Sequence, residues 1–173
     1  MSDVAETLSQ HARKNVAEIT DKWIRRAEHM YGISLQPISV SFDLRGRTAG
    51  MFRVKDGVRE IRFNPWIFSE YFEENLNETI PHEVAHATNY VLHGTRGVKP
   101  HGAEWKRIMM DFGVEPRVTC EFRLDKVPQR KVRRYDYRCA CTAHQLTAYR
   151  HNKITRRQAC YVCKFCRTTL YPA

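Results

Sequence analysis

The sequence predicts an α+β fold, in which helices and a small antiparallel sheet form one domain and a small cysteine-rich module follows. Two observations predict this division. Residues 1–124 alternate between helical periodicity and short period-two strands, whereas paired cysteines gather in residues 135–173. We therefore expect a first domain over 1–124, a basic linker over 125–134 and a second module over 135–173.

The first element is one long helix, or two nearly continuous ones, over residues 3–31, a stretch that contains neither glycine nor proline. Its apolar residues recur at helical spacing, and Gly32 follows as a stop signal. The apolar stripe consists of Leu8, Ala12, Val16, Ile19, Trp23, Ala27 and Met30.

Three strands are expected next, and they form the small antiparallel sheet. Residues 38–42 alternate between apolar and polar side chains. Residues 51–54 and 58–63 flank Asp56-Gly57, a dipeptide typical of two-residue hairpin turns.

The register of this hairpin sets Phe52 opposite Ile61, so that both apolar side chains share one face. Asn64 and Pro65 then have the properties of a helix N-cap and a first helical residue. The helix that they begin leads toward the central motif of the chain.

The central motif is His82-Glu83-x-x-His86, which matches the pattern H-E-x-x-H. Residues four apart share one face of a helix, so the two histidines can bind one metal ion. Pro81 places His82 near a helix start or bend, and Gly94 ends the helix. Another face carries an apolar stripe that indicates burial, made of Leu76, Ile80, Val84, Ala87 and Val91.

His101 is the expected third ligand. It lies four residues before Trp105, and the loop that precedes it can return it to the first two histidines. A second amphipathic helix is marked by Trp105, Ile108, Met109 and Phe112. Glu104 is the rival third ligand. His93 lies about 10 Å along the first helix from the motif, too far to share the metal.

Three neutral imidazoles suit zinc, and a catalytic zinc keeps an open coordination position. Glu83 can then act as general base on a zinc-bound water, which makes peptide hydrolysis the expected chemistry. The oxyanion of that reaction needs a hydrogen-bond donor, for which Arg47, Tyr90 and His93 are candidates. In zinc peptidases an edge strand beside the metal helix often receives the substrate as an added strand.

A second zinc site, structural in kind, is predicted near the end of the chain. Cys163 and Cys166 form a C-x-x-C pair, and Cys141 and His144 share that spacing about twenty residues earlier. Cys139 is the competing ligand, since alternate residues of a strand usually point to opposite faces. Two such pairs are typical of a zinc ribbon.

The segments around these pairs carry further expectations. Paired strands are expected over 146–154 and 159–162, and another strand over 118–124, where Cys120 is a small buried hydrophobe. Cys160 is not assigned to the predicted zinc site. Arg167 follows the last cysteine where glycine is common, so the bend there is expected to be strained.

The formal net charge of +10 lies entirely in the last third of the chain. Residues 1–116 hold 15 basic and 16 acidic residues, and residues 117–173 hold 14 basic and 3 acidic ones. This segregation favours a nucleic acid partner, DNA without sequence specificity, over the alternative of a solvated basic surface. The expected contacts are Arg133, Arg134, Arg150, Lys153, Arg156 and Arg157. Nearby aromatic rings either stack on bases or form a small core, namely Tyr135, Tyr137, Tyr149 and Tyr161.

No apolar run is long enough to span a membrane, and residues 1–10 lack the features of a signal peptide. We therefore expect a cytoplasmic monomer without a membrane partner. Cysteines stay reduced in that compartment, which favours metal binding over disulfides.

Motifs spread over nearly the whole chain from about residue 30 resemble the SprT family of bacterial proteins. They lie at residues 44–46, 48–50, 61–65, 81–86, 100–105, 137–141, 144–147, 150–152 and 163–166. The family is similar in its metalloprotease domain to Spartan, the eukaryotic DNA-dependent protease that degrades proteins crosslinked to DNA. The resemblance implies a zincin-like fold with zinc at His82, His86 and His101 and with Glu83 catalytic.

The expected function is therefore that of a zinc-dependent endopeptidase acting on DNA-bound or DNA-crosslinked proteins. The alternative is a non-catalytic, zinc-stabilised protein that binds nucleic acid or has a regulatory role. Glu83 argues against that alternative, because a structural zinc has no use for a general base beside its ligands. A third option is a peptidase that acts on free peptides.

Overall fold

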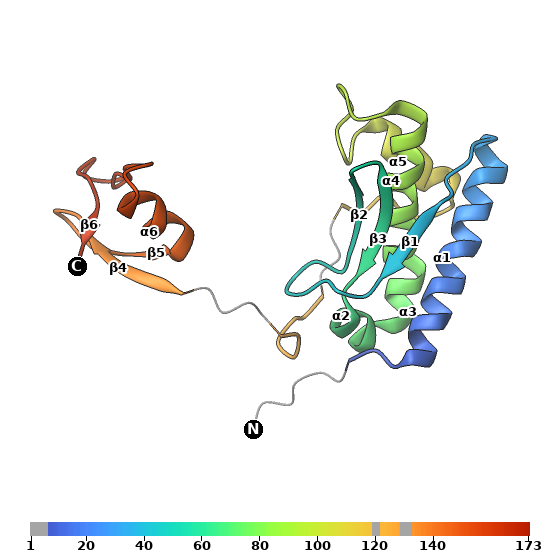
Figure 1. The fold of residues 1–173 in the computed structure, drawn as a ribbon, viewed down its shortest axis with the longest axis horizontal. Helices are drawn as coiled ribbons and strands as arrows, with labels where there is room; N and C mark the ends of the chain where they lie inside the picture. The colour runs from blue at the N-terminus through green and yellow to red at the C-terminus, as the bar shows by residue number, and fades with distance from the viewer. Residues whose placement is uncertain (1–6, 119–121, 129–132) are drawn as a thin grey trace. The chain divides into compact units, whose positions relative to one another are not determined.

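The computed structural model describes residues 7–118, 122–128 and 133–173. The chain folds as two compact units, Met1–Gln129 and Arg130–Ala173 (Figure 1). The division falls within the expected linker over 125–134. None of the described helices is long and apolar enough to cross a membrane.

The first unit begins with α1 (Gln10–Tyr31). The Ser9 side chain caps this helix by accepting a hydrogen bond from the Ala12 N–H at 3.2 Å. Gly32, at positive φ, ends it as predicted. Residues 3–6 of the expected helix lie outside the described residues, and residues 7–9 are not helical.

The sheet of this unit has the order β1-β3-β2 and consists of β1 (Ile38–Ser41), β2 (Gly50–Lys55) and β3 (Val58–Phe63). The predicted hairpin is confirmed, since Asp56 and Gly57 form its turn at positive φ. Phe52 lies opposite Ile61, as the predicted register requires.

The expectation of a wholly antiparallel sheet is wrong, because β1 pairs with β3 in parallel. β1 and β2 run in opposite directions, and residues 42–49 connect them. Two strand spacings amount to only about 10 Å, a gap that eight residues span easily. β3 turns back from the hairpin into that gap and so gains a partner on each side.

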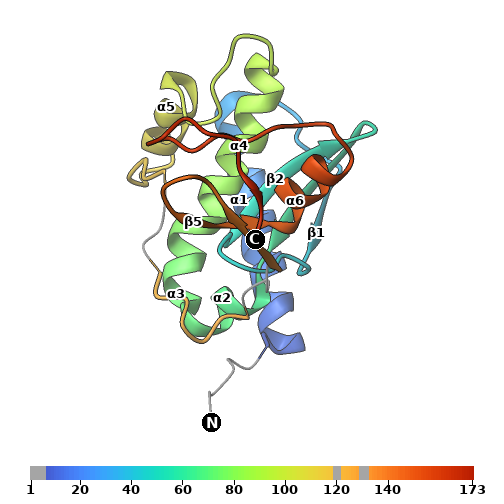
Figure 2. The same cartoon turned by 90° about the vertical axis from the view of Figure 1, so that its left-hand side faces the viewer.

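A helical segment follows the sheet, made of α2 (Pro65–Glu70), α3 (Phe72–Glu74), the π-helical turn η1 (Asn75–Thr79) and α4 (Ile80–His93). The non-helical residue Tyr71 separates α2 from α3. The predicted N-cap is confirmed, because Asn64 Oδ1 accepts hydrogen bonds from the Trp66 and Ile67 N–H groups. α4 packs against α1, β2 and β3, and α5 (Ala103–Asp111) lies beside its later turns (Figure 2).

The core of the first unit lies between the sheet and these helices. Four predicted stripe residues of η1 and α4 are buried, namely Leu76, Ile80, Val84 and Ala87. The largest fully buried side chains of the unit include Trp105, Phe63, Phe68 and Phe112. The core thereby fixes one face of α4 and leaves another face for polar residues.

The strand expected over 118–124 is not formed by its described residues, 118 and 122–124. Cys120 lies outside the described residues.

The second unit contains β4 (Arg134–Arg138), β5 (Ala143–Thr147), α6 (Ala148–Thr155) and β6 (Tyr171–Pro172). Its antiparallel sheet has the order β5-β4-β6. A small core is formed by Tyr137, Cys139, Leu146, Cys163 and Leu170.

The strands expected over 146–154 and 159–162 are wrong. β5 ends at Thr147 and the chain continues as α6. Ala148, Arg150 and Lys153 have high helix propensity, which outweighs the alternation of apolar and polar residues that suggested a strand. The later segment contributes only an isolated bridge between Val162 and Thr169.

Candidate metal centres and catalytic groups

The H-E-x-x-H motif lies in the first turns of α4, directly after the wide π-helical turn η1. Pro81 occupies the start of α4, as predicted, and the wider turn relieves its clash with the preceding helix. His82 and His86 bring their Nε2 atoms to 3.1 Å from each other. The Nε2 atom of His101, from the loop before α5, lies 3.1 Å from that of His86 and 3.2 Å from that of His82.

This triangle of nitrogen atoms fits a metal ion. Two nitrogens bound to a tetrahedral zinc at about 2.0–2.1 Å lie about 3.3 Å apart, close to the three observed separations. The described residues of the first unit place these three histidines, and no other such group, within common ligand distance. The donor set therefore suits zinc and leaves a fourth position for water or substrate.

Burial prepares the three imidazoles for metal binding. It lowers the pKa of His82 to about 4 and that of His86 to about 3, with neighbouring histidines adding to both effects. Burial also lowers the pKa of His101. The buried ring of Trp105, from α5, packs against all three imidazoles at centroid distances of 4.7–5.5 Å. The histidines are thus held as neutral rings, the form that binds a metal.

Glu83 is 5% exposed and lies between α4 and β2. Its Oε2 atom accepts a hydrogen bond of 2.7 Å from the Phe52 N–H. Burial raises the pKa of Glu83 to about 8, and the Phe52 N–H opposes that rise. A dication at the histidines lowers this pKa again. A carboxyl group in such a setting can accept a proton and return it.

Gly50 makes the close approach of β2 to α4 possible. A Cβ atom at Gly50 would lie 2.7 Å from both Glu83 Oε1 and Thr79 Cγ2, closer than real Cβ atoms come. Sequence reasoning missed Gly50 and the Phe52 N–H, because neither offers a functional side chain. The one sequence feature that could have pointed to this close approach was a glycine, Gly50, directly before a predicted strand.

β2 is an edge strand, since its outer side pairs with no described strand. The Asn64 N–H donates to the Ala49 carbonyl, which sets the alternation of hydrogen bonds along the hairpin. By that alternation Phe52 and Val54 direct their backbone groups away from β3, and the bond from Phe52 to Glu83 agrees with it. An extended peptide can therefore pair with β2 beside the histidines.

Two cavities border the histidines. One, of about 240 Å³, is lined by His82, Glu83 and Arg47 among others, and the second, of about 510 Å³, is lined by residues that include Tyr90. Arg47 and Tyr90 therefore lie at the site as candidate oxyanion donors, whereas His93 is exposed and lines neither cavity.

Glu104, the rival third ligand, is exposed and does not belong to the metal-binding group. It lies in the first turn of α5, whereas His101 precedes that helix. The geometry therefore favours the three histidines as the ligand set.

The second unit brings four thiols together. The Sγ atoms of Cys139, Cys141, Cys163 and Cys166 all lie within 4.8 Å of one another. Two of these separations are 3.4 Å, for Cys139 and Cys141, and 3.8 Å, for Cys141 and Cys163. Sulfurs of a tetrahedral zinc site lie about 3.8 Å apart. The five described cysteines are free thiols, and Cys160 stands outside the group.

Cys139 takes part in this group in place of His144. The Cys139 N–H donates to the Thr142 carbonyl, so these residues form the turn between β4 and β5, where strand alternation does not apply. His144 Nε2 lies 3.2 Å from Cys139 Sγ and can orient that thiolate. The strained bend is confirmed, since Arg167 has a φ of +60°.

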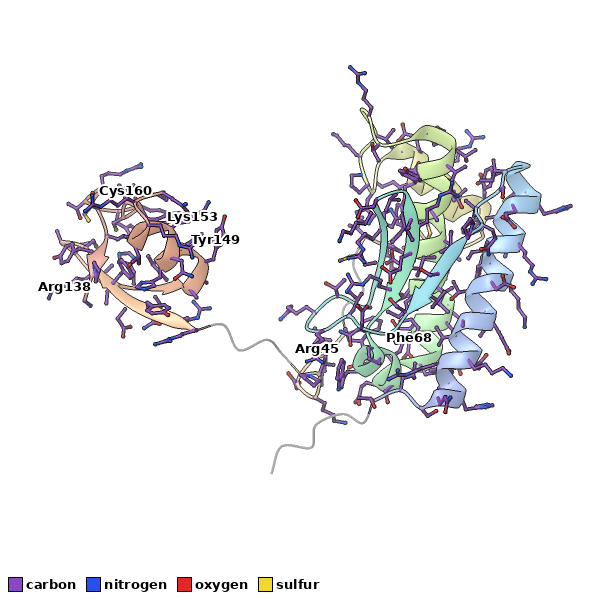
Figure 3. All side chains as sticks on the ribbon, viewed as in Figure 1. Arg45, Phe68, Arg138, Tyr149, Lys153 and Cys160 are labelled. Atoms are coloured by element: carbon purple, nitrogen blue, oxygen red, sulfur yellow. The ribbon has the colours of Figure 1, made fainter. Side chains whose placement is uncertain are left out.

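Residues 133–173 hold nine lysines and arginines and a single acidic residue, Asp136. None of these basic side chains is part of a salt bridge in the described second unit. Four of them lie over aromatic rings: Arg133 over Tyr135, Arg138 over Tyr171, Arg150 over Tyr161 and Lys153 over Tyr149. The last pair lies on α6 (Figure 3). Arg134, Arg156 and Arg157 are exposed.

The tyrosines of this unit divide between core and surface. Tyr137 is buried, and Tyr135 and Tyr161 are half-buried against the small core. Tyr149 is 65% exposed, and Phe165, which sequence reasoning did not consider, is 88% exposed. Phe165 lies between two cysteines of the C-x-x-C pair, a position whose side chain points outward from a metal knuckle.

The fold and these two groups define a mixed α/β protein equipped to bind metal at a three-histidine and at a four-cysteine centre. Residues 20–125 match the SprT-like family. Protein SprT of Vibrio parahaemolyticus is 36% identical over 148 residues, which cover 85% of this chain and 86% of that protein. Protein SprT of Actinobacillus succinogenes is 33% identical over 167 residues, 96% of this chain and 95% of that protein. The chain therefore belongs to the SprT-like family.

Proposed function

We propose that this protein is a zinc-dependent endopeptidase that cuts proteins bound or crosslinked to DNA. The observation that carries the proposal is the meeting of three metal-binding nitrogens with the buried carboxyl group of Glu83 and the outer edge of β2, which pairs with no described strand. Membership of the SprT-like family supports a metallopeptidase.

His82, His86 and His101 hold the zinc, which, when bound, polarises the scissile carbonyl and lowers the pKa of a water. Glu83 accepts the proton of the attacking water and delivers it to the leaving amine. The Phe52 N–H keeps the carboxyl group of Glu83 in place during both transfers.

The substrate pairs with β2 as an added strand. Backbone hydrogen bonds to the outer edge of β2 recognise any extended peptide, so they bind without regard to sequence. Arg47 and Tyr90 line the cavities that border the histidines and are the donors available to the oxyanion. The enzyme is thus expected to cut unfolded segments.

The second unit binds DNA without sequence specificity. A structural zinc held by its four cysteines stabilises a unit that has only a small core. Its unpaired basic residues contact phosphates, and the exposed rings of Tyr149 and Phe165 stack on unpaired bases. DNA binding raises the local concentration of any protein bound nearby, so an active site that holds its substrates mainly by their backbone meets them there. The protein is proposed to act as a monomer in the cytoplasm.

The test is cleavage of a DNA-binding protein by the zinc-loaded chain, with and without single-stranded DNA. Wild-type protein is expected to cleave only when DNA is present, and the Glu83→Gln variant is expected to keep its zinc and lose cleavage. DNA binding by that variant, measured by fluorescence anisotropy, is expected to stay unchanged.

Two outcomes separate the proposal from its alternatives. DNA binding without cleavage in any condition points to a zinc-stabilised nucleic-acid-binding protein. Cleavage that is independent of DNA leaves a peptidase for free peptides, with a basic surface that serves solubility.

A further inference from the structure

The larger cavity at the site is lined by apolar and aromatic side chains together with a few polar ones. It measures about 510 Å³, enough for a large side chain. β2 contributes Phe52 and Val54, α4 contributes Tyr90, and the loop after α4 contributes Val98 and Pro100. The rings of Phe52 and Tyr90 lie 5.9 Å apart. Side chains of this kind suit an aromatic guest.

Among the polar lining residues, Asn89 has a side-chain oxygen that lacks a hydrogen-bond partner. It lines the cavity and is 5% exposed. Among the described residues, Asn89 Oδ1 is the only buried side-chain oxygen or nitrogen without a hydrogen bond. Buried acceptors are almost always paired, so an unpaired one on a residue that lines a cavity indicates a ligand that donates.

The position of the cavity relates it to the substrate strand. Phe52 and Val54 share one face of β2, and both line the cavity. A peptide added to β2 directs every second side chain toward that same face. His86 and His101 also line the cavity, so the side chain that enters it belongs to a residue close to the scissile bond.

The charge of the surroundings selects a neutral guest. No carboxylate lines the cavity, and the metal-bound histidines place positive charge beside it. A lysine or arginine would therefore be buried without a counter-charge, which is unfavourable. A carboxylate cannot donate to Asn89 Oδ1. A neutral aromatic side chain with an O–H group satisfies both the walls and the acceptor.

We propose that this cavity binds a tyrosine side chain of the substrate near the scissile bond, and that Asn89 determines this specificity by accepting the tyrosine hydroxyl hydrogen bond. The inference rests on the proposed peptidase function. Phenylalanine fits the same walls but leaves Asn89 unpaired, so it is the weaker guest.

The experiment compares two peptide series that differ only in tyrosine or phenylalanine at one position. Wild-type enzyme is expected to cleave the tyrosine series with a kcat/KM about tenfold higher. Asn89→Leu, which removes the acceptor at similar size, is expected to abolish this preference. Asn77→Leu, the same change at an exposed residue outside the cavity, is the matched control and retains it.

A second variant and a binding measurement keep the test independent of folding and of catalysis. Asn89→Asp keeps an acceptor and adds the counter-charge that a lysine side chain lacks in the wild-type cavity. This variant should therefore retain the preference for tyrosine over phenylalanine and gain cleavage next to lysine. Calorimetric binding of both peptides to the zinc-loaded Glu83→Gln chain should show the same tenfold difference. Binding selectivity without wild-type cleavage overturns the peptidase and keeps the cavity. Cleavage with equal use of tyrosine and phenylalanine overturns the cavity and keeps the peptidase.

Discussion

At the scale of single residues, the candidate catalytic group depends on neighbours that have no reactive side chain. Glu83 is positioned by a backbone N–H at Phe52 and by the missing side chain of Gly50. Both lie on β2, so the carboxyl group of α4 is oriented by the strand proposed to hold the substrate. Any change that moves β2 away from α4 should therefore disturb catalysis before it disturbs metal binding.

Gly50→Ala tests this dependence. The added methyl group would collide with Glu83 and Thr79, so β2 must shift or the carboxyl group must turn. We expect a loss of at least about tenfold in kcat/KM, and a loss of stability of about 1–3 kcal/mol, with zinc content unchanged. Peptide cleavage, urea unfolding and metal analysis give the three quantities. Met51→Ala, at the exposed neighbour on β2, should leave kcat/KM near the wild-type value.

The two metal centres should empty independently, because they use separate ligands in separate units. Zinc analysis of the purified wild-type chain is expected to give two ions per chain. His101→Ala should remove one of them and abolish cleavage, whereas Cys163→Ser should remove the other and destabilise the second unit. A chain that retains both zinc ions after His101→Ala would contradict the three-histidine site.

At the scale of elements, Asn64 connects the loop before β2 to the start of α2. Its Nδ2 group donates to the Gly46 and Thr48 carbonyls, while its Oδ1 atom caps α2. The side chain is fully buried, so no water can replace these bonds. This residue therefore holds the loop that carries Arg47 to the cavity beside His82 and Glu83.

Asn64→Ala should lower the free energy of unfolding by about 2 kcal/mol or more, since it removes a helix cap and leaves two carbonyls unpaired. Urea unfolding followed by circular dichroism measures the change. Asn77→Ala removes one exposed hydrogen bond from η1 and should cost less than about 0.5 kcal/mol. Equal effects of the two substitutions would show that Asn64 has no special structural role.

The pair formed by Asp43 and Arg62 should make stability depend on pH in acid. Two hydrogen bonds, of 2.9 and 2.8 Å, from the Arg62 guanidinium lower the pKa of Asp43. A lowered pKa in the folded state contributes stability that is present above the ordinary carboxyl pKa of 3.8 and is lost as pH falls through the folded value.

Asp43→Asn should therefore lower stability at neutral pH and matter progressively less below pH 4. Urea unfolding over a pH series gives the difference between the two proteins. Asp21→Asn, which removes an exposed pair with Arg25 on α1, should have little effect at any pH. A difference that stays constant down to pH 2 would exclude the proposed pairing as its cause.

Sequence patterns predicted those parts of the elements and site that local rules determine. Helical periodicity placed His82 and His86 on one face, and the Asp56-Gly57 turn fixed the register of its hairpin. The parallel pairing of β1 was not predictable, since it depends on which strand fills a gap formed by distant residues. The choice between His144 and Cys139, which the sequence left open, likewise depends on where β4 ends and its turn begins.

At the scale of the whole molecule, the proposed function assigns separate roles to two units with separate cores. The first unit contains the groups proposed for catalysis and has balanced formal charge, whereas the second contains the whole excess of positive charge. Such a division allows DNA affinity to change without any change in the chemistry of cleavage. The two activities should therefore be separable by substitution in the complete chain.

Replacing Arg150, Arg156 and Arg157 by glutamine tests this separation. Each lost phosphate contact removes about 0.7 from the slope of log affinity against log salt for single-stranded DNA, so the triple variant should lower that slope by about 2. DNA-dependent cleavage should fall in parallel with binding, while cleavage of a short free peptide should keep the wild-type kcat/KM.

Fluorescence anisotropy across a salt series and cleavage assays with and without DNA provide both measurements. The matched control replaces Lys14, Lys22 and Arg25 on α1 by glutamine, which removes the same charge from the first unit. This control should leave the salt slope unchanged if DNA binds only to the second unit. An equal loss of affinity in both triple variants would show instead that the net charge of the protein attracts DNA, and not the second unit in particular. Long-range attraction depends on the total charge, whereas phosphate contacts depend on the residues that make them.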